Sequence, residues 1–348
     1  ILPVTETGEG SNFLQMGRNK LGLTLNPMKP EGAEIVKKLV ATADVVVANL
    51  PAETLAAMGL DYESLKSVKP DIILTTSSTF GSVGPYSHRV GFDTIGQAMS
   101  GAMYLTGDEA EPMKAWVPYV DFGTALFSAV GTLAALMERR ETGKGQMVEA
   151  SLLGTALAFN NATIIEQAVI GADRTATGNR GQSTAPADAF QTKDGWIFVL
   201  AMGPPLFKRW TDLMGEDHWH DDPRFRDDQS RGDNGAVISE RMAEWCRERT
   251  SEEALAALDE ARLPAGPVLT PAEALADPHV QARGYFKMLD YPGLPRPAPI
   301  SDTPVTLSET PGGIRHRAPT LGEHTDQILG ELGYGADQIA ELRDKRVV

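Results

Sequence analysis

Strand-like and helix-like patterns alternate along the first part of the chain. Residues 44–50 and 71–76 are apolar and rich in β-branched side chains without polar alternation, as expected of strands covered on both faces. The predicted elements are, in order, a strand at 21–25, a helix from Pro30, a strand at 44–50, helices at 53–58 and 62–68, and a strand at 71–76. This order predicts an α/β fold with a doubly wound parallel sheet.

The later part of the chain opens with a long amphipathic pattern. Residues 122–140 predict a helix with many small side chains, which allow close packing. Residues 178–189 are dominated by Gly, Ser, Thr and Pro and predict a linker or an active-site loop, and the Pro-rich stretch 291–304 predicts a second linker. Further predicted elements are strands at 146–151 and 195–200, a helix ending at Asn160, and helices at 205–214, 235–249 and 251–261.

Length and charge limit the class of protein. A chain of 348 residues exceeds the size at which one core usually stops growing, so it predicts two domains. The 32 basic and 47 acidic residues give a net charge of −15, which argues against binding nucleic acid or an anionic membrane. No apolar run approaches the roughly 20 residues of a membrane helix. Cys246 is the single cysteine, which excludes an intrachain disulfide, and we expect a cytoplasmic protein.

Several common catalytic signatures are missing from the sequence. No G-x-G-x-x-G follows a predicted strand, so a nicotinamide-dependent oxidoreductase is disfavoured. The sequence also lacks G-x-x-x-x-G-K-[ST], H-E-x-x-H and G-x-S-x-G, which disfavours phosphate-loop NTPases, zinc peptidases and α/β-hydrolases.

One histidine cluster contains side chains that could hold a metal ion. His218 and His220 stand two residues apart next to Asp221 and Asp222, and two such histidines can converge on one side of a strand. The alternative is a solvated acidic loop before Pro223. Because this spacing is common and no third histidine is near, we expect no metal.

Asp121 is the leading candidate for chemistry. It stands immediately before the predicted helix 122–140, where aspartate is a favoured N-cap whose charge is stabilised by the helix dipole. A carboxylate held ionised at a helix N-terminus can also act as a nucleophile where water is excluded. Its position alone leaves both interpretations open.

Short motifs along nearly the whole chain resemble, in their order, the family III CoA-transferases of the formyl-CoA and carnitine CoA-transferase type. The motifs of the first part are Arg18-Asn19-Lys20, Pro30-Glu31-Gly32, Ala43-Asp44-Val45 with Asn49, Gly84-Pro85-Tyr86, Gly91-Phe92-Asp93, Gln97-Ala98-Met99-Ser100-Gly101 and Asp121. Those of the second part are Glu141-Thr142-Gly143-Lys144-Gly145-Gln146, Gly178-Asn179, Asp194-Gly195, Pro264-Ala265-Gly266-Pro267-Val268, Asp277-Pro278-His279 and Leu321-Gly322-Glu323-His324-Thr325.

The resemblance implies an architecture. It predicts a large doubly wound CoA-binding domain from residues 1–180 and 296–348, and a small inserted domain from residues 181–295 with linkers. Two such ring-like subunits are expected to interlock as a homodimer. Family members begin with a strand–helix unit that helps bind CoA, and we expect this sequence to lack it.

The resemblance also implies a mechanism that uses Asp121. An aspartate at this position attacks an acyl-CoA thioester, forms a mixed anhydride, and then carries CoA as an aspartyl thioester to a carboxylic acid. A weak nucleophile and a hydrolysable anhydride require orientation and exclusion of water. Residues 178–186 resemble the loop that covers this site; the other interpretation is an interdomain linker. Coenzyme A is thus expected as part of the substrate, with no permanently bound cofactor.

The family positions that contact CoA predict the binding residues. They are Arg18, Lys20, Asn49, Leu50, Met58, Arg89, Gly91, Phe92 and Asp93. Four departures weaken the expected phosphate-binding loop. Pro51, Ala52 and Glu53 stand where the family often carries Arg, Pro and Gly, and Ala57 stands where a second basic residue is common.

Two alternative functions remain beside CoA transfer. A 2-methylacyl-CoA racemase of the same fold needs two acid/base groups, and Phe92 occupies the position of the histidine that supplies one of them. His88 is the nearest histidine in sequence. The other alternative is a catalytically silent CoA-binding protein. The sequence does not identify the acyl-CoA donor or the acid that receives CoA.

Overall fold

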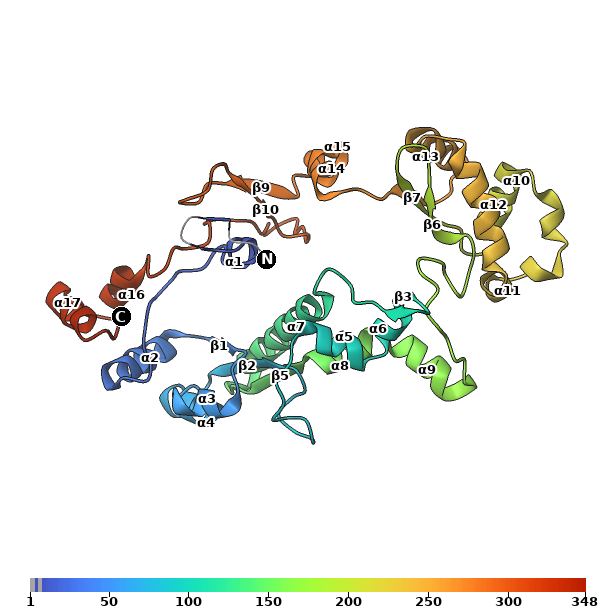
Figure 1. Ribbon diagram of the computed structural model, residues 1–348. Helices are drawn as coiled ribbons and strands as arrows, with labels where there is room; N and C mark the ends of the chain where they lie inside the picture. The colour runs from blue at the N-terminus through green and yellow to red at the C-terminus, as the bar shows by residue number, and fades with distance from the viewer. Residues whose placement is uncertain (1–3, 6–7) are drawn as a thin grey trace. The chain divides into compact units, whose positions relative to one another are not determined.

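The computed structural model describes residues 4, 5 and 8–348, and these form two compact units. The first unit comprises residues 1–78, 126–150 and 271–348, and the second comprises residues 79–125 and 151–270. The chain is a mixed α/β protein, with the elements labelled in Figure 1.

A parallel sheet forms the centre of the first unit. Its strands are β1 (Val45–Ala48), β2 (Ile73–Ser78) and β5 (Met147–Ser151), in the order β1-β2-β5. Strands β1 and β2 run parallel with Val45 opposite Ile73, and α3 (Ala52–Ala57) and α4 (Tyr62–Val68) connect them. The parallel sheet with crossover helices confirms the predicted α/β class.

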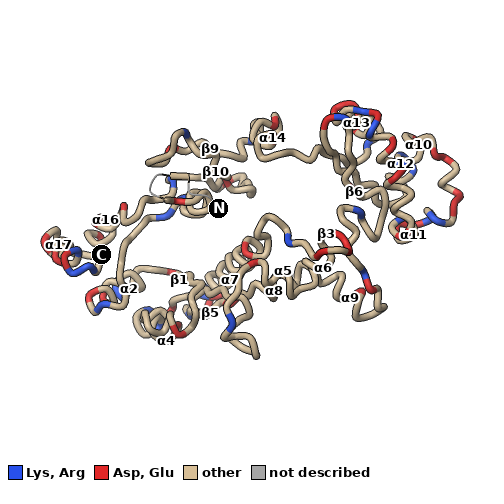
Figure 2. The backbone as a smooth tube through the Cα atoms, viewed as in Figure 1, with Lys and Arg blue, Asp and Glu red and all other residues tan. Residues whose placement is uncertain are grey.

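Three small cores hold the rest of the first unit. Helix α2 (Pro30–Thr42) packs Val36 and Val40 against the sheet region and Ile35 against the C-terminal helices. Leu14 belongs to a third core with Tyr291 and Ile300. The remaining elements are α1 (Ser11–Met16), α14 (Pro271–Ala276), α15 (Pro278–Arg283), β9 (Phe286–Leu289), β10 (Ala298–Ser301), α16 (Thr325–Glu331) and α17 (Ala336–Asp344). Helix α17 carries three acidic residues, Asp337, Glu341 and Asp344, and one basic residue, Arg343 (Figure 2).

Two predictions for this unit were wrong. Residues 21–25 form no strand, because their backbone groups bond to side chains and a loop of the C-terminal region: Gly22 N–H donates to His324 Nδ1, and Thr24 N–H donates to Thr325 Oγ1. The predicted linker 291–304 contains β10, which pairs antiparallel with β9. A two-stranded sheet tolerates Pro299 because one edge of each strand needs no partner.

The second unit contains the helices near Asp121 and an antiparallel sheet. Its first elements are α5 (Asp93–Met99), α6 (Ala102–Leu105), β3 (Gly107–Asp108), β4 (Glu111–Pro112), α8 (Leu152–Phe159) and α9 (Asn161–Ile170). The sheet has the order β6-β7-β8, from β6 (Ala187–Gln191), β7 (Trp196–Leu200) and β8 (Ala265–Pro267). It is followed or flanked by α10 (Pro204–Met214), η1 (Asp217–His220), η2 (Pro223–Phe225), α11 (Asp228–Asp233), α12 (Gly235–Arg247) and α13 (Ser251–Glu260).

One hydrophobic core lies entirely within residues 185–263. It includes Trp210 and Trp219, whose rings are 5.6 Å apart, together with the buried Cys246. The predicted small domain of residues 181–295 therefore contains a core of its own. The two compact units divide the chain at other positions, and the predicted domain boundaries stay a prediction.

Helix α7 (Tyr119–Thr142) has residues in both units. By length and composition alone it could cross a membrane, with a mean hydropathy of 1.6 over its most apolar window, of which 28% is buried. The expectation that no apolar run is long enough is therefore wrong for this helix. A single helix of this kind is no proof of membrane insertion, because core helices of globular proteins meet the same criterion.

Candidate functional site

Asp121 lies in the first turn of α7. The sequence placed it just before the helix as the N-cap, but the helix begins at Tyr119, so Asp121 is the third helical residue. Its carboxylate is exposed at the end of the helix where the dipole favours negative charge. The N-cap interpretation is therefore wrong, while the position at the helix N-terminus is confirmed.

The hydrogen-bond acceptor for this helix end comes from another helix. Oδ2 of Asp93, the first residue of α5, accepts from the backbone N–H of Val120 at 2.8 Å and of Asp121 at 3.1 Å. These are among the N–H groups that a helix cannot satisfy internally. Asp93 thus caps α7 from outside the helix and fixes the backbone of Asp121.

Two glycines let α5, α7 and α8 approach closely. A Cβ at Gly96 would lie 3.1 Å from Val120 Cγ1 and 3.3 Å from the backbone oxygen of Leu152. A Cβ at Gly123 would lie 2.4 Å from the Phe159 ring. Any larger side chain at these positions would separate the helices that hold Asp121.

The electrostatics of the site raise the pKa values of two groups. Partial burial, and then the negative charge of Asp93, raise the pKa of Asp121 above its usual value. The same two causes raise the pKa of Tyr119. A carboxylate with a raised pKa is more basic, and hence a better nucleophile once it is ionised.

The predicted CoA contacts of the second unit lie just before α5 or at its first residue. Arg89 is exposed, with its guanidinium 4.0 Å from the centroid of the Tyr86 ring. Gly91 precedes Phe92, whose side chain is 79% exposed. Asp93 is only 5% exposed, and protein donors occupy both of its carboxylate oxygens. The assignment of these residues to CoA stays a prediction.

The other predicted contacts lie in the first unit. Asn49 and Leu50 directly follow β1, at the carboxyl edge where α/β sheets bind ligands. Met58 is half-buried at the end of α3. Arg18 donates to the backbone oxygen of Gln15, and Lys20 is exposed. Their roles in binding CoA also stay predictions.

Sequence reasoning missed the structural roles of two motif residues. Asn19 adopts a φ of 61°, and its Oδ1 accepts from the backbone N–H groups of Arg315 and His316. Gln97 is 2% exposed and donates to Oδ1 of Asp93. The spacing of Asp93 and Gln97, four residues apart on a helix, was the signal that could have found this pair.

The segment 178–186 is bonded at both ends within the second unit. Gly178 N–H donates to the backbone oxygen of Gly107 in β3 at 2.6 Å. Near its other end, Thr184 is buried, and its hydroxyl lies 3.1 Å from Oδ1 of Asp228. Whether this segment covers a bound substrate stays a prediction.

The histidine cluster does not gather as a metal site would. Trp219 is buried between the two histidines in the short helix η1. His218 Nδ1 lies 3.6 Å from Glu216, whereas His220 Nε2 bonds to Thr211 at 3.0 Å. His220 forms a group with Asp212 and Asp217, whose ligand atoms lie within 4.8 Å of one another. All three residues are exposed, and Lys208 already bonds both oxygens of Asp212 at 2.9 Å.

Comparisons with known proteins agree on one family. The sequence model of the family described as "CoA-transferase family III" matches residues 1–325. The chain is 35% identical to the succinyl-CoA–D-citramalate CoA-transferase of Chloroflexus aurantiacus over 96% of its own length and 83% of that protein. It is 32% identical to the succinate–glutarate CoA-transferase of Agrobacterium fabrum over 95% of its length and 84% of that protein. A crystal structure of a CaiB/BaiF family protein from Brucella suis superposes with a TM-score of 0.80 and 32% identity, covering 93% of this chain and 85% of the other.

Proposed function

This chain belongs to CoA-transferase family III, and on that premise we propose that it moves CoA from an acyl-CoA to a carboxylic acid through covalent intermediates on Asp121. The membership makes the chain a CoA-transferase that acts on acyl-CoA thioesters and acids. The observation that carries the covalent step is the placement of Asp121: an exposed carboxylate in the first turn of α7, with its backbone bonded to Asp93.

The reaction consists of four acyl transfers. The Asp121 carboxylate attacks the thioester carbon of the donor and expels CoA thiolate, which leaves a mixed anhydride. The thiolate attacks Cγ of Asp121, releases the donor as a carboxylate and forms an aspartyl-CoA thioester. The acceptor carboxylate then attacks Cγ and expels the thiolate again. Finally the thiolate attacks the acceptor carbonyl, which yields the new acyl-CoA and restores Asp121.

Each feature of the site serves one requirement of these steps. The fixed backbone of Asp121 lowers the entropic cost of aligning a weak nucleophile with a thioester. Its raised pKa strengthens the carboxylate as a nucleophile. Exclusion of water would protect the anhydride, and we assign that role to residues 178–186. The predicted CoA contacts Asn49, Leu50 and Met58, which directly follow β1 and α3, would bind the nucleotide portion of the substrate.

We propose succinyl-CoA as the donor and a dicarboxylic acid of similar size as the acceptor. The support comes from two relatives that are 35% and 32% identical to this chain, whose names specify succinyl-CoA with D-citramalate and succinate with glutarate. A screen of dicarboxylate acceptors with succinyl-CoA, read by mass spectrometry of the CoA products, tests this assignment. Transfer from other acyl-CoA donors but not from succinyl-CoA would contradict it.

Trapping the intermediate tests the covalent mechanism. Hydroxylamine converts an aspartyl anhydride or thioester to a hydroxamate, and borohydride reduces the thioester to an alcohol. After incubation with succinyl-CoA, peptide mass analysis should find either modification at Asp121 alone. Turnover without a trappable adduct at Asp121 would contradict the mechanism.

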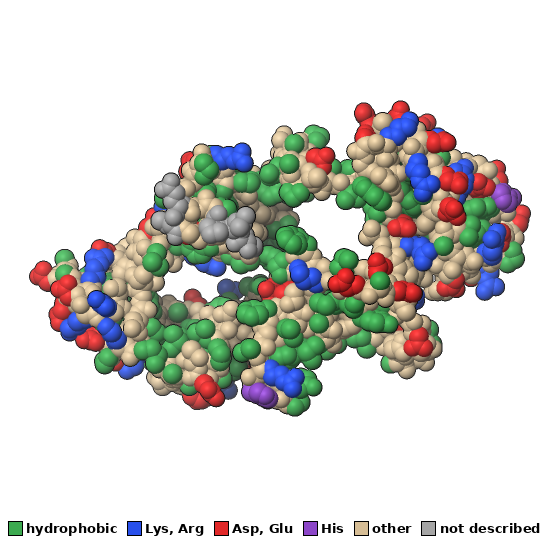
Figure 3. Space-filling view, viewed as in Figure 1, with side chains coloured by type: hydrophobic (Ala, Val, Ile, Leu, Met, Phe, Trp, Pro, Cys, Tyr) green, Lys and Arg blue, Asp and Glu red, His purple; other side chains and the backbone are tan. Residues whose placement is uncertain are grey.

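We also propose that the chain works as an interlocked cytoplasmic homodimer. Four side chains of α7 support a partner surface, since Leu126, Val130, Leu133 and Met137 are each more than 60% exposed in the single chain. They repeat at helical spacing and form one apolar stripe. Figure 3 shows hydrophobic side chains exposed in the region of α7. The buried single cysteine supports a reducing compartment.

A further inference from the structure

A buried chain of hydrogen bonds connects α5 to the segment that leads into α7. Oδ2 of Asp93 accepts from Val120 N–H at 2.8 Å and from Asp121 N–H at 3.1 Å. Oδ1 of Asp93 accepts from Nε2 of Gln97, and Oε1 of Gln97 accepts from Ala115 N–H at 2.9 Å. Asp93 is 5% exposed and Gln97 is 2% exposed, so the protein shields these bonds from water.

The backbone N–H groups at the two ends of this hydrogen-bond series determine which groups donate and which accept along it. Backbone N–H groups can only donate, so the oxygens that face Val120, Asp121 and Ala115 must accept. Gln97 therefore points its amide NH₂ toward Asp93, and Asp93 must accept through both oxygens. An ionised carboxylate meets this requirement, whereas an asparagine would place one NH₂ against another.

We propose that Asp93 is a positioning residue of the transfer reaction, supported by Gln97, which holds the backbone of Asp121 and strengthens its carboxylate through a nearby fixed negative charge. The inference rests on the proposed function because it assigns Asp121 as the nucleophile. The proposal also explains why an aspartate and a glutamine stand four residues apart on α5. Asp93 bonds to the start of α7, and Gln97 bonds to Asp93 and to the backbone of Ala115 before that helix. Asp93 then acts through Asp121 and needs no contact with CoA.

The charges around Asp121 support this role. Asp93 on α5 is the charged group that raises the pKa of Asp121, after burial itself. Tyr119, on the same helix as Asp121, is the other titratable group of this turn. Helix α8, which packs against α5 and α7, carries no ionisable side chain. Removing the charge of Asp93 should therefore lower the pKa of Asp121.

A polarity swap separates the charge from the hydrogen bonds. In the double variant Asp93→Asn/Gln97→Glu, the asparagine oxygen can accept from Val120 and Asp121, and its NH₂ can donate to the new carboxylate at position 97. The second oxygen of that carboxylate can accept from Ala115 N–H. Every bond is kept, while the negative charge moves one side chain further from Asp121. In Asp93→Asn alone, the NH₂ group of the asparagine faces the NH₂ group of Gln97, and the hydrogen bond between the two side chains is lost. This single variant is therefore the matched control for the loss of that bond.

We expect Asp93→Asn to have a lower Tm than the wild type, and the double variant to regain most of that decrease. Relative to the wild type, its plateau kcat should fall about tenfold, its KM for succinyl-CoA should change less than twofold, and the acidic limb of its kcat–pH profile should move to lower pH. A wild-type kcat and profile would overturn the inference. So would a raised KM at unchanged kcat, which would make Asp93 a substrate contact, or a double variant no more stable than Asp93→Asn.

A measurement without turnover keeps the inference distinct from the proposed function. Carbodiimides modify protonated carboxyl groups, so the pH dependence of Asp121 modification, followed by peptide mass, reports its titration. The midpoint should lie at lower pH in the double variant than in the wild type, and equal midpoints would overturn the inference. Failure to trap an adduct at Asp121 would instead contradict the proposed mechanism and leave this comparison intact.

Discussion

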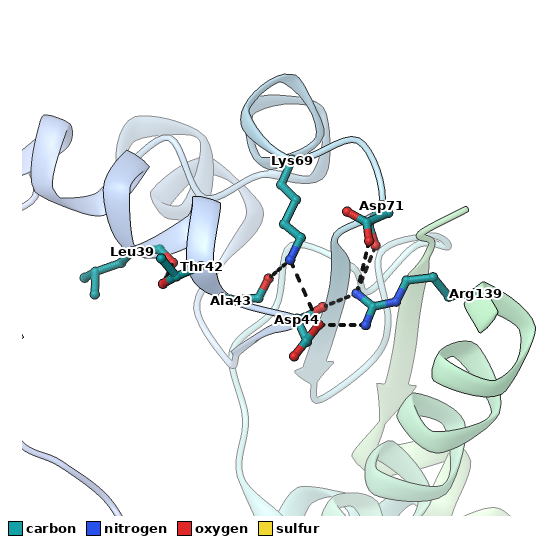
Figure 4. A network of polar contacts seen from close by, with 7 residues as sticks. All are labelled: Leu39, Thr42, Ala43, Asp44, Lys69, Asp71 and Arg139. Carbon is teal, nitrogen blue, oxygen red and sulfur yellow. Dashed lines mark hydrogen bonds and ion pairs between the residues drawn. The ribbon is translucent and has the colours of Figure 1, made fainter. Parts of the chain in front are cut away.

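Arg139 Nη2 donates to Oδ1 of Asp44 at 2.7 Å and so ties the last turns of α7 to the residue that precedes β1 (Figure 4). The other nitrogen, Nη1, donates to the backbone oxygens of Asp44 and Asp71, each at 3.3 Å. Lys69 adds a bond to the backbone oxygen of Ala43 at 2.7 Å. These contacts satisfy carbonyl groups at the start of two parallel strands and hold the strands beside α7.

The Arg139 network should contribute to stability because its side chain is only 15% exposed. We expect Arg139→Met to lower the Tm clearly, and Arg139→Lys to restore only part of the loss, because lysine lacks the planar fork. Lys37→Met is the control: its pair with Glu34 is 59% and 63% exposed and should contribute little. Equal Tm values for Arg139→Met and Lys37→Met would contradict this prediction.

The same network should depend on pH with a defined sign. The hydrogen bond from Arg139 lowers the pKa of Asp44 below its ordinary value of 3.8. The unfolded chain therefore takes up the proton first, so the stabilisation is present above about pH 4 and is lost as the pH falls further. The Tm difference between wild type and Arg139→Met should shrink in that acidic range. A difference that grows there would contradict the prediction.

Glu323 gives a second pH-dependent test, in one of the motif regions. Its carboxylate accepts from both Arg317 nitrogens, at 2.7 and 2.8 Å, and from Thr320 N–H, and these bonds lower its pKa from 4.5 to about 2. Glu323→Gln should lower the Tm at neutral pH, and the deficit should disappear as the pH falls from 4.5 to about 2.

The control for Glu323 is Asp326→Asn. Asp326 pairs with Arg343 at the surface, where the two side chains are 62% and 51% exposed. Solvent screening should make this pair contribute little at any pH. A deficit for Glu323→Gln that persists unchanged at about pH 2 would show that packing, and not the charge, is responsible.

The elements that sequence patterns predicted are those with a clear helical period or a continuous apolar run. Helix α2 and strands β1 and β2 were predicted because their apolar residues face a local core. The segment 21–25 also looks like a strand, but its backbone partners are His324 and Thr325, about 300 residues away. No local pattern can reveal such a partner, and the same is true of the pairing of β10 with β9.

The candidate site was predicted only in part, for a related reason. Asp121 could be found because it stands at the start of a long helical pattern. The burial of Asp93 could not, since it depends on how α5 and α8 pack against α7 through Gly96 and Gly123. Those contacts join residues far apart in sequence, and without them the sequence offered Asp93 only as a predicted CoA contact.

The proposed homodimer can be tested through the apolar stripe on α7. Light scattering should give twice the 37.4 kDa of one chain, and the dimer should persist on dilution because interlocked rings cannot separate while folded. Leu133→Lys on the stripe should impair assembly, whereas Glu138→Lys, an exposed position beside it, should not. A monomer at micromolar concentration for the wild type would contradict the proposal.

Asp121→Ala should abolish CoA transfer, because no other carboxylate occupies the first turn of α7. The fold should remain, since Asp93 bonds to the backbone of residue 121 and not to its side chain. Burial and the charge of Asp93 raise the pKa of Asp121, so its ionised form is less favourable in the folded than in the unfolded chain. We therefore expect the free energy of unfolding of Asp121→Ala at neutral pH to be no lower than that of the wild type. Steady-state assays with succinyl-CoA, alongside circular dichroism, check both parts. Transfer at the wild-type rate would exclude Asp121 as the nucleophile.

The last prediction separates CoA transfer from racemisation and depends on Phe92. Racemisation would require Asp121 to remove the α-proton on one face while a second acid returns a proton on the other. Phe92 carries no titratable group, so it cannot return that proton. Proton NMR in deuterated water should therefore detect no deuterium at the α-carbon of a 2-methylacyl-CoA incubated with the wild-type protein.

A gain-of-function variant sharpens this test. Phe92→His places an imidazole where a racemase needs its second acid/base group, so slow deuterium incorporation is expected in this variant but not in the control Phe92→Leu. CoA transfer should fall in both variants, because each removes the aromatic ring of phenylalanine. Rapid incorporation by the wild type that is lost in Asp121→Ala would contradict the transferase mechanism. The exposed His88, or Asp93, would then be the proton donor to examine.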